Sequence, residues 1–491
     1  MRRLFVSICC FLSIFSLIEL SGCKVGPKYS RPETIAETAA GYVRPGIHNQ
    51  DVNSVQGIEV DRWWVRFGDS VTSDLVRRAM ENSYDLKAAA ARVLQAQASL
   101  AEAGGRLWPD VSYNLSRDRG KRSFNFGGGG RFSIISETWT QNISVAYIVD
   151  FFGKLRHAKQ AAWADMIASE ANEQALINSI IATVIMARID IATTQKRLAI
   201  ARANILSRSS TLEIVERRYS KGLVGPVDVR LARENLEASK ALEPSIELSL
   251  ATAQHGLDVL LGRQPGISEY LPETLADLPD LVPMPIGVPA SLLDRRPDVI
   301  SAEFALRAAN ERIGVSIAQL YPDLTLTASY GASADRWRDI WEHFSESYSA
   351  LFTLAQPIFK GGQLRAQIDA AKARYEELAA NYATAVLTAM REVEDALVSE
   401  QMLQKQLEHA QRRFIEAKAA EELSRQRYQR GVEGILAVLE SERRCRVAEE
   451  ELAILKGQIW TTRVNLHLAL GGDWDYKNES EVYVVKDDEQ R

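Results

Sequence analysis

The side chains that most often carry out catalysis are scattered along this chain of 491 residues. Its six histidines lie far apart, so a His-based metal or nucleophile site would have to be assembled entirely by the fold. The glycine run at 127–130 is not followed by the Lys-Ser/Thr pair that a phosphate-binding loop requires. No paired carboxylates and no Ser/His/Asp order stand out. The sequence therefore predicts a protein that is not an enzyme and that holds no metal or cofactor.

One residue does carry a predicted chemistry, the cysteine at position 23. Two arginines and an apolar run precede the motif LSGC at 20–23. A basic start, an apolar stretch and small residues are typical of an export signal, and the final cysteine makes this one resemble a bacterial lipobox. We expect removal of residues 1–22 and acylation of Cys23 with diacylglycerol and N-palmitate. Lys24 follows instead of the aspartate of an inner-membrane retention signal, which favours the outer membrane.

Charge, hydropathy and cysteine usage narrow the class of protein. Lys and Arg number 59 against 64 Asp and Glu, a net charge of −5 that disfavours a nucleic-acid binder. A hydrophobic content of 46% excludes global disorder. Cys9 and Cys10 leave with the signal, so Cys445 remains alone as a packed helix residue, and no disulfide framework is expected. Past the signal, no apolar run reaches the roughly 20 residues of a membrane-spanning helix.

The chain contains two copies of one pattern. The motif LWPD at 107–110 returns as LYPD at 320–323, a shift of 213 positions. RYSKGLVGPVDVRL at 218–231 returns as RYQRGVEGILAVLE at 427–440, a shift of 209 positions. Because the matches keep the same order along the chain, we expect a duplicated unit of about 210 residues.

Each copy begins with an Ala-rich helical stretch, 71–106 and then 299–319, and continues into a pair of strands. Apolar and polar residues alternate along 111–116, 139–149 and 324–331, and a partner strand is expected at 349–356. This period of two predicts one apolar face and one face of small or polar residues. In a membrane barrel the apolar face contacts lipid and the polar face lines water, whereas in a soluble sandwich the apolar face is core.

A very long helix is expected after each strand pair, over 155–221 and 364–430, because neither range contains proline. At about 1.5 Å per residue, each would approach about 100 Å. Apolar residues in the second range recur at alternating steps of four and three, which is typical of coiled coils. Glycine-rich turns at 221–226 and 430–434 precede return helices at 227–261 and 436–470, and Pro244 predicts a kink or break in the first return.

The number of strands constrains assembly. Four strands do not close a membrane barrel, since at least eight are needed and open edges do not survive in lipid. Two copies would supply eight strands and three would supply twelve. A barrel therefore requires an oligomer.

These motifs together resemble the outer-membrane factors of tripartite efflux, the TolC-like outer membrane lipoproteins. The resemblance runs from Cys23 to about Trp474 and rests on several segments in order. They are CKVGPKYSRP at 23–32, DRWWVRFGD at 61–69, DRRPDV at 294–299, YPDLTLTASYG at 321–331 and LALGGDW at 468–474.

The resemblance implies an α+β membrane protein: a trimer whose four strands per chain make a 12-stranded outer-membrane β-barrel, continued by a long α-helical periplasmic tunnel. It also implies a periplasmic membrane-fusion adaptor and an inner-membrane efflux pump as partners, in a Gram-negative bacterium. We expect a signal peptide at 1–22, a lipid-anchored extended segment at 23–60, structural repeats at 61–286 and 287–474, and a polar tail at 475–491.

Family members close the tunnel at its periplasmic end, near the second long turn. Carried over through the motif at 427–440, the constricting apolar residue falls on Leu436 and the acidic one on Glu440. In a trimer, three Glu440 carboxylates around a narrow axis would repel one another and attract cations. The alternative for Glu440 is a solvated charge on the helix surface, and the alternative for Leu436 is ordinary helix packing. By the same resemblance the two turns meet the adaptor, through Gly222, Leu223, Val224, Gly431, Val432 and Glu433.

The sequence thus predicts a passive duct that passes small molecules, such as drugs, metals or other toxic solutes, from the pump to the exterior. A conduit for type I polypeptide secretion is the alternative within the family. A periplasmic coiled-coil scaffold lipoprotein is a third hypothesis, which the alternating strands disfavour because a scaffold has no need of lipid-like strand faces. The region 118–137 is expected to be a mobile external loop.

Overall fold

The computed structural model describes residues 24–34, 36, 64, 69–126, 130–267, 271 and 292–472. The expected signal peptide, Cys23, most of the segment 23–60 and the tail 475–491 lie outside this part. The chain divides into two compact units. The first contains residues 24–32, Arg92–Glu170 and Ser301–Tyr382, and the second contains the described parts of Glu33–Ala91, Ala171–Ile300 and Ala383–Arg491.

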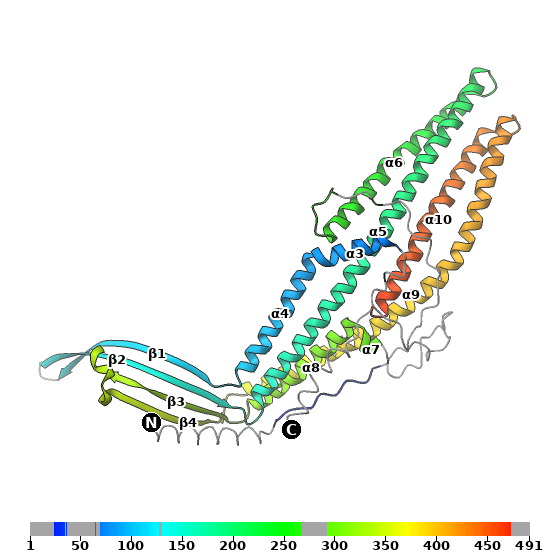
Figure 1. Cartoon of the computed structure of the whole chain (residues 1–491). Helices are drawn as coiled ribbons and strands as arrows, with labels where there is room; N and C mark the ends of the chain where they lie inside the picture. Colours follow the sequence, from blue (N-terminus) through cyan, green and yellow to red (C-terminus); the bar gives the residue numbers. More distant parts are fainter. Residues whose placement is uncertain are drawn as a thin grey trace. The chain divides into compact units, whose positions relative to one another are not determined.

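The first unit is built on one antiparallel sheet in the order β1-β2-β3-β4 (Figure 1). The strands are β1 (Asp110–Phe126), β2 (Gly130–Val149), β3 (Asp323–Ala334) and β4 (Glu346–Ala355), with short 3-10 helices η4 (Trp337–Trp341) and η5 (His343–Ser345) between the last two. Within the described residues, β1 pairs with β2 alone and β4 with β3 alone. Both outer strands of a single chain therefore keep an open edge.

The register of the sheet separates an apolar face from a polar one. Residues opposite one another share a face, because side chains alternate along a strand. One row across all four strands is Tyr113, Ile143, Tyr330 and Tyr348. The next row, on the opposite face, is Ser112, Ser144, Ser329 and Ser349, with hydroxyl–hydroxyl hydrogen bonds of 2.8 Å and 2.9 Å within its outer pairs. The predicted alternation of faces is confirmed.

The first strand pair is longer than expected, and the predicted loop at 118–137 is wrong. β1 continues to Phe126 and β2 begins at Gly130. Cross-strand pairs support this extension: Phe124 stacks on Phe132 with ring centroids 5.2 Å apart, and the Arg117 guanidinium lies 2.8 Å from the Glu137 carboxylate. The glycine run at 127–130 suggested a long loop between the strands, but the backbone pairing continues from Asp118 opposite Thr138 to Phe126 opposite Gly130.

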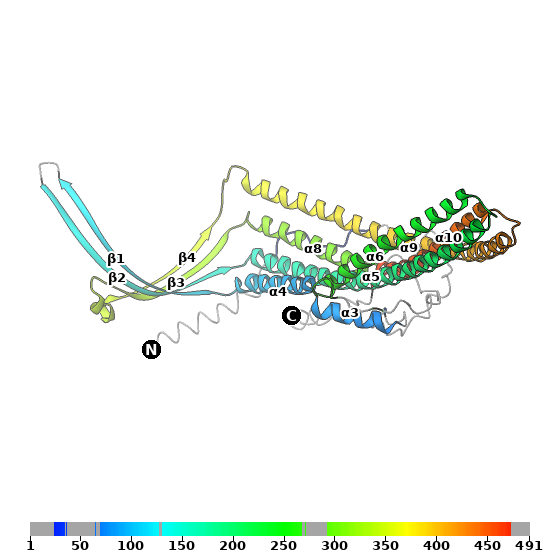
Figure 2. The same ribbon diagram turned by 90° about the horizontal axis from the view of Figure 1, so that it is seen from above.

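The helices follow the duplicated order and mostly match the predicted ranges. They are α3 (Ser70–Asn82), α4 (Tyr84–Gly105), α5 (Lys154–Ser220), α6 (Pro226–Leu260), α7 (Leu292–Arg295), α8 (Pro297–Ala318), α9 (Gln363–Gln429) and α10 (Ile435–Ala469). In both views α5 and α6, and likewise α9 and α10, run as antiparallel pairs joined by a turn (Figures 1 and 2). The two long helices begin and end within one residue of their predicted limits.

Two details of the helices differ from the prediction. The first Ala-rich stretch is not one helix but two, divided at Ser83, whose hydroxyl accepts a hydrogen bond from the Leu86 amide. Conversely, α6 continues through Pro244 without a break. On either side of the proline, Arg202 of α5 pairs with Glu243 at 2.8 Å and with Glu247 at 2.7 Å.

The core of the second unit gathers α3, α5, α6 and α10. Ile185 and Ile191 of α5 pack with Leu75 of α3, Leu261 after α6 and Val464 of α10. Contrary to expectation, α5 contains an 18-residue stretch apolar enough to cross a membrane. Because 56% of that stretch is buried and the helix supplies this core, its apolar character is explained by packing.

Candidate functional site: the ends of the helical hairpins

The two helical hairpins end in turns of the same geometry. Gly222 and Gly431 have positive φ angles of 70° and 81°. Across the first turn the Leu223 amide donates to the Arg218 carbonyl at 3.0 Å, and across the second the Val432 amide donates to the Arg427 carbonyl at 3.1 Å. This is a Schellman ending, in which a left-handed glycine lets the last helical carbonyls find donors. Glycine at these positions is thus required by the backbone, whatever else the turns do.

Apolar side chains at the turns are only partly exposed. Leu223 and Val432 face solvent. Val224, expected to be exposed, instead packs against the cluster of Val215, Val229, Ala232, Tyr428, Ile435 and Val438 that joins the two hairpins. Glu433 is half-buried and pairs with Arg427 at 2.9 Å.

Leu436 lies at the second position of α10 and is 65% exposed. Its counterpart in the first repeat, 209 positions earlier, is Val227 of α6, which is 66% exposed. Neither side chain belongs to the cluster beneath the turns. Packing among the described residues therefore leaves the apolar side chain at 436 largely exposed.

Glu440 does not stand as a free carboxylate. Arg443 donates two hydrogen bonds of 2.8 Å to its carboxylate, and Arg444 donates a third of 2.7 Å. The hydrogen bonds from Arg443 and then Arg444 lower the pKa of Glu440 to about 2. The sequence reasoning missed both arginines, although spacings of three and four along a helix place side chains on one face.

Behind Glu440, a polar network fixes α9 and α10 against α5. The Glu442 carboxylate is fully buried; it accepts a hydrogen bond of 2.6 Å from the Thr211 hydroxyl and one of 3.1 Å from Arg425. Arg425 also donates to the Ser207 hydroxyl of α5. A buried ion pair of this kind contributes little net stability, but removal of one partner is costly because it leaves an uncompensated buried charge.

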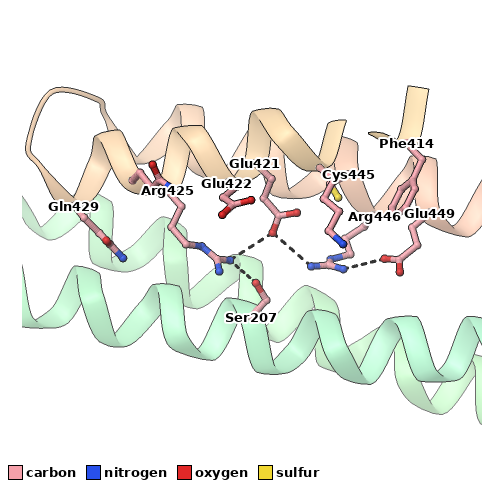
Figure 3. Close-up of a pocket in the computed structure, with 11 residues that line it drawn as sticks. Ser207, Phe414, Glu421, Glu422, Arg425, Gln429, Cys445, Arg446 and Glu449 are labelled. Atoms are coloured by element: carbon pink, nitrogen blue, oxygen red, sulfur yellow. Dashed lines mark hydrogen bonds and ion pairs between the residues drawn. The ribbon is translucent and has the colours of Figure 1, made fainter. Parts of the chain in front are cut away.

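A pocket of about 450 Å³ opens beside this network (Figure 3). In it Arg446 reaches Glu421 and Glu449, at 3.5 Å and 3.0 Å, while Cys445 lies against Glu421. Burial, followed by the hydrogen bond to Glu421, raises the pKa of the Cys445 thiol to about 12. The thiol is therefore protonated and unreactive at neutral pH, as expected of a packed cysteine.

The segment that follows position 23 is firmly held within the first unit. His157 of α5 is almost fully buried, with Nδ1 2.6 Å from the Glu311 carboxylate of α8 and Nε2 2.8 Å from the Val25 carbonyl. Lys24 reaches the same carboxylate at 3.0 Å. Although burial raises the pKa of Glu311, these hydrogen bonds bring it below its usual value. The Val25 amide donates to the Phe152 carbonyl, so the segment is fastened where β2 passes into α5.

Comparison with known proteins places these features in a family. The model of the family described as "Outer membrane efflux protein" matches residues 75–263 and again 288–472. The chain is 32% identical over 436 residues to the pyoverdine export outer membrane protein OpmQ of Pseudomonas putida, covering 87% of this chain and 92% of the relative. It is 30% identical over 484 residues to the toluene efflux pump outer membrane protein TtgF of Pseudomonas putida, covering 95% and 97%.

The fold agrees with that assignment. The outer-membrane channel OprN superposes with a TM-score of 0.81 at 28% identity, covering 92% of this chain and 99% of that one. The double match of the family model bears out the internal duplication, and the solved channel bears out the arrangement of strands and long helices. The chain belongs to the outer membrane efflux protein family and is an outer-membrane channel of tripartite efflux systems, not an enzyme.

Proposed function

We propose that this chain forms a lipid-anchored trimeric channel that closes at Leu436 and Glu440 and docks a periplasmic adaptor with its two hairpin turns. The observation that carries the proposal is the four-stranded sheet with one apolar face, one serine-lined face and two open edges. Three copies would supply twelve strands and leave no edge in the bilayer. The apolar rows would then contact lipid, and the serine row would line water.

The proposed anchor is a lipid on Cys23. The segment beginning at Lys24 is bound by His157 and Glu311 next to the strand ends, and aromatic residues gather there, with Phe152 stacked on Tyr321 at 4.6 Å. Aromatic rings of this kind favour the boundary between lipid and water. A chain attached one residue before Lys24 would enter the membrane at this boundary.

The proposed constriction is formed by Leu436, whose side chain the other described residues leave 65% exposed. Three copies facing a common axis would bury these apolar side chains against one another and exclude water from the path. Leu223 and Val432, exposed at the turns, would supply apolar contact to the adaptor. The exposed glycine turns leave the backbone accessible around them.

Small solutes are the proposed cargo. Of the two relatives named above, one is named for the export of pyoverdine and the other for the efflux of toluene. These two compounds differ greatly in chemistry, although the two proteins named for them are about equally similar to this chain. We therefore assign the choice of cargo largely to the pump, with polypeptide secretion as the outcome to be excluded.

The test is the conductance of the purified protein in planar bilayers, together with its oligomeric mass in detergent. Leu436→Ser is expected to raise the frequency of open channels, because a hydrated hydroxyl no longer closes the axis by excluding water. Val227→Ser is the matched control, since it makes a similar change at an equally exposed position of the first repeat. A mass other than a trimer would contradict the assembly, and equal conductance of the two variants would contradict the gate.

A further inference from the structure

The charge at the proposed gate is opposite in sign to the one that a carboxylate at position 440 suggests. Arg443 and Arg444 both bind Glu440, so each chain places two guanidinium groups around one carboxylate. All three side chains remain substantially exposed, at 42% for Glu440, 59% for Arg443 and 70% for Arg444. The cluster keeps a net positive charge that solvent and passing solutes can reach.

Nearby acidic groups do not offset this charge. Glu433 is engaged by Arg427 at 2.9 Å, and the fully buried Glu442 is engaged by Arg425 and Thr211. Arg430 adds a further cation at the turn itself. Over residues 425–446 of this hairpin, cationic side chains therefore outnumber acidic ones by six to three.

The arrangement is confined to the second hairpin. At the same shift of 209 positions, the first repeat has Leu231, Glu234 and Asn235 where the second has Glu440, Arg443 and Arg444. Helix geometry and turn type are the same in both hairpins, so neither requires these arginines. Only the hairpin that carries Leu436 holds them.

We propose that Arg443 and Arg444 make the entrance of this channel favour anionic solutes, such as small molecules with a carboxylate or phosphate group. The proposal rests on the trimeric gate proposed above: three chains would gather three carboxylates and six guanidinium groups around the axis. A narrow passage lined by surplus guanidinium raises the local concentration of anions and repels cations. This bias acts on charged cargo in addition to selection by the pump.

The test measures the reversal potential of single channels under a potassium chloride gradient, in the otherwise unchanged chain and on the Leu436→Ser background. We expect chloride to be preferred over potassium. Glu440→Gln should strengthen this preference, and the double variant Arg443→Gln/Arg444→Gln should reverse it. Each charge should change the permeability of each ion about twofold, as one unit charge does at about 10 Å in water. The effect has opposite signs for chloride and potassium, so their permeability ratio should change about fourfold.

Arg233→Gln is the matched control, because Arg233 is an exposed arginine near the start of α6 that pairs with Glu216 at 2.7 Å. It should leave the permeability ratio unchanged. Preference for potassium in the unchanged channel, or an unaltered ratio in the double arginine variant, would overturn the proposal. If Leu436→Ser opens the channel while the ratio stays fixed, only the charge proposal fails; if the ratio moves but Leu436→Ser has no effect, only the assignment of Leu436 fails.

Discussion

The Thr211 hydroxyl of α5 donates a hydrogen bond of 2.6 Å to the fully buried Glu442 carboxylate of α10, which lies 231 positions further along the chain. Arg425 of α9 donates to the same oxygen at 3.1 Å. Three helices thus meet at one carboxylate just behind Glu440. Movement of the α9 and α10 pair away from α5 would break the Thr211 hydrogen bond and leave Arg425 as the remaining partner of this carboxylate.

Thr211→Val removes the hydroxyl at nearly constant volume and tests this junction. We expect the free energy of local opening at the start of α10 to fall by about 1–3 kcal/mol, because a buried acceptor loses a partner. Hydrogen exchange of the amides of α10 measures it. Ser441→Ala is the control: the Ser441 hydroxyl donates to the Val438 carbonyl of its own helix and not to α5 or α9 among the described residues, so its loss should leave that exchange nearly unchanged. Equal protection in the two variants would contradict the bridging role.

The pKa of Glu440 gives a prediction for pH. Hydrogen bonds from Arg443 and Arg444 lower this pKa from its usual value near 4.5 to about 2. A lowered pKa means that the pairing is fully present above the usual value and is lost as the pH falls through about 2. The reversal potential should therefore stay constant from about pH 8 to about pH 4, as far as Glu440 is concerned.

Removing both arginines should restore titration. In Arg443→Gln/Arg444→Gln the carboxylate returns toward its usual pKa, so the cation preference of that variant should fade between about pH 5 and about pH 4 as Glu440 takes up a proton. The triple variant that also carries Glu440→Gln is the control and should not titrate. A fading that persists in the triple variant would assign it to another group.

Acylation at Cys23 is tested by metabolic labelling with radioactive palmitate. Cys23→Ala should abolish the label, since no other cysteine of the exported chain is expected to be reactive. Cys445→Ala is the matched control and should keep the label, because the Cys445 thiol is buried with its pKa raised to about 12. Label retained in Cys23→Ala would refute the proposed anchor.

Docking of the adaptor is tested at the exposed apolar residues of the turns. Leu223→Asp and Val432→Asp should each weaken binding of the purified adaptor about tenfold or more, because burying one such side chain contributes about 1.5–3 kcal/mol. Binding is measured by surface plasmon resonance with the trimer in detergent. Arg430→Gln changes a polar neighbour on the same turn and should have a smaller effect. Unchanged affinity in both aspartate variants would place the docking surface elsewhere.

Features that depend on local backbone geometry could be predicted from the amino-acid sequence. Alternation with a period of two fixed which strand residues share a face, because successive side chains point to opposite sides. The absence of proline allowed the two 67-residue helices, and the glycines marked their ends. The repeat was visible because both copies need the same turns. Pro244 predicted a kink or break, but α6 is not broken there.

Features that depend on which helices face one another could not be predicted from the sequence and became visible only in the folded chain. The junction of Thr211 and Glu442, and the contacts of His157 with Val25 and Glu311, join residues more than 130 positions apart. Helix rotation and register set such contacts, and neither follows from local periodicity. The spacing of Glu440 to Arg443 and Arg444 was readable, but only the side-chain conformations showed that both arginines turn toward the one carboxylate, because each had other directions open to solvent.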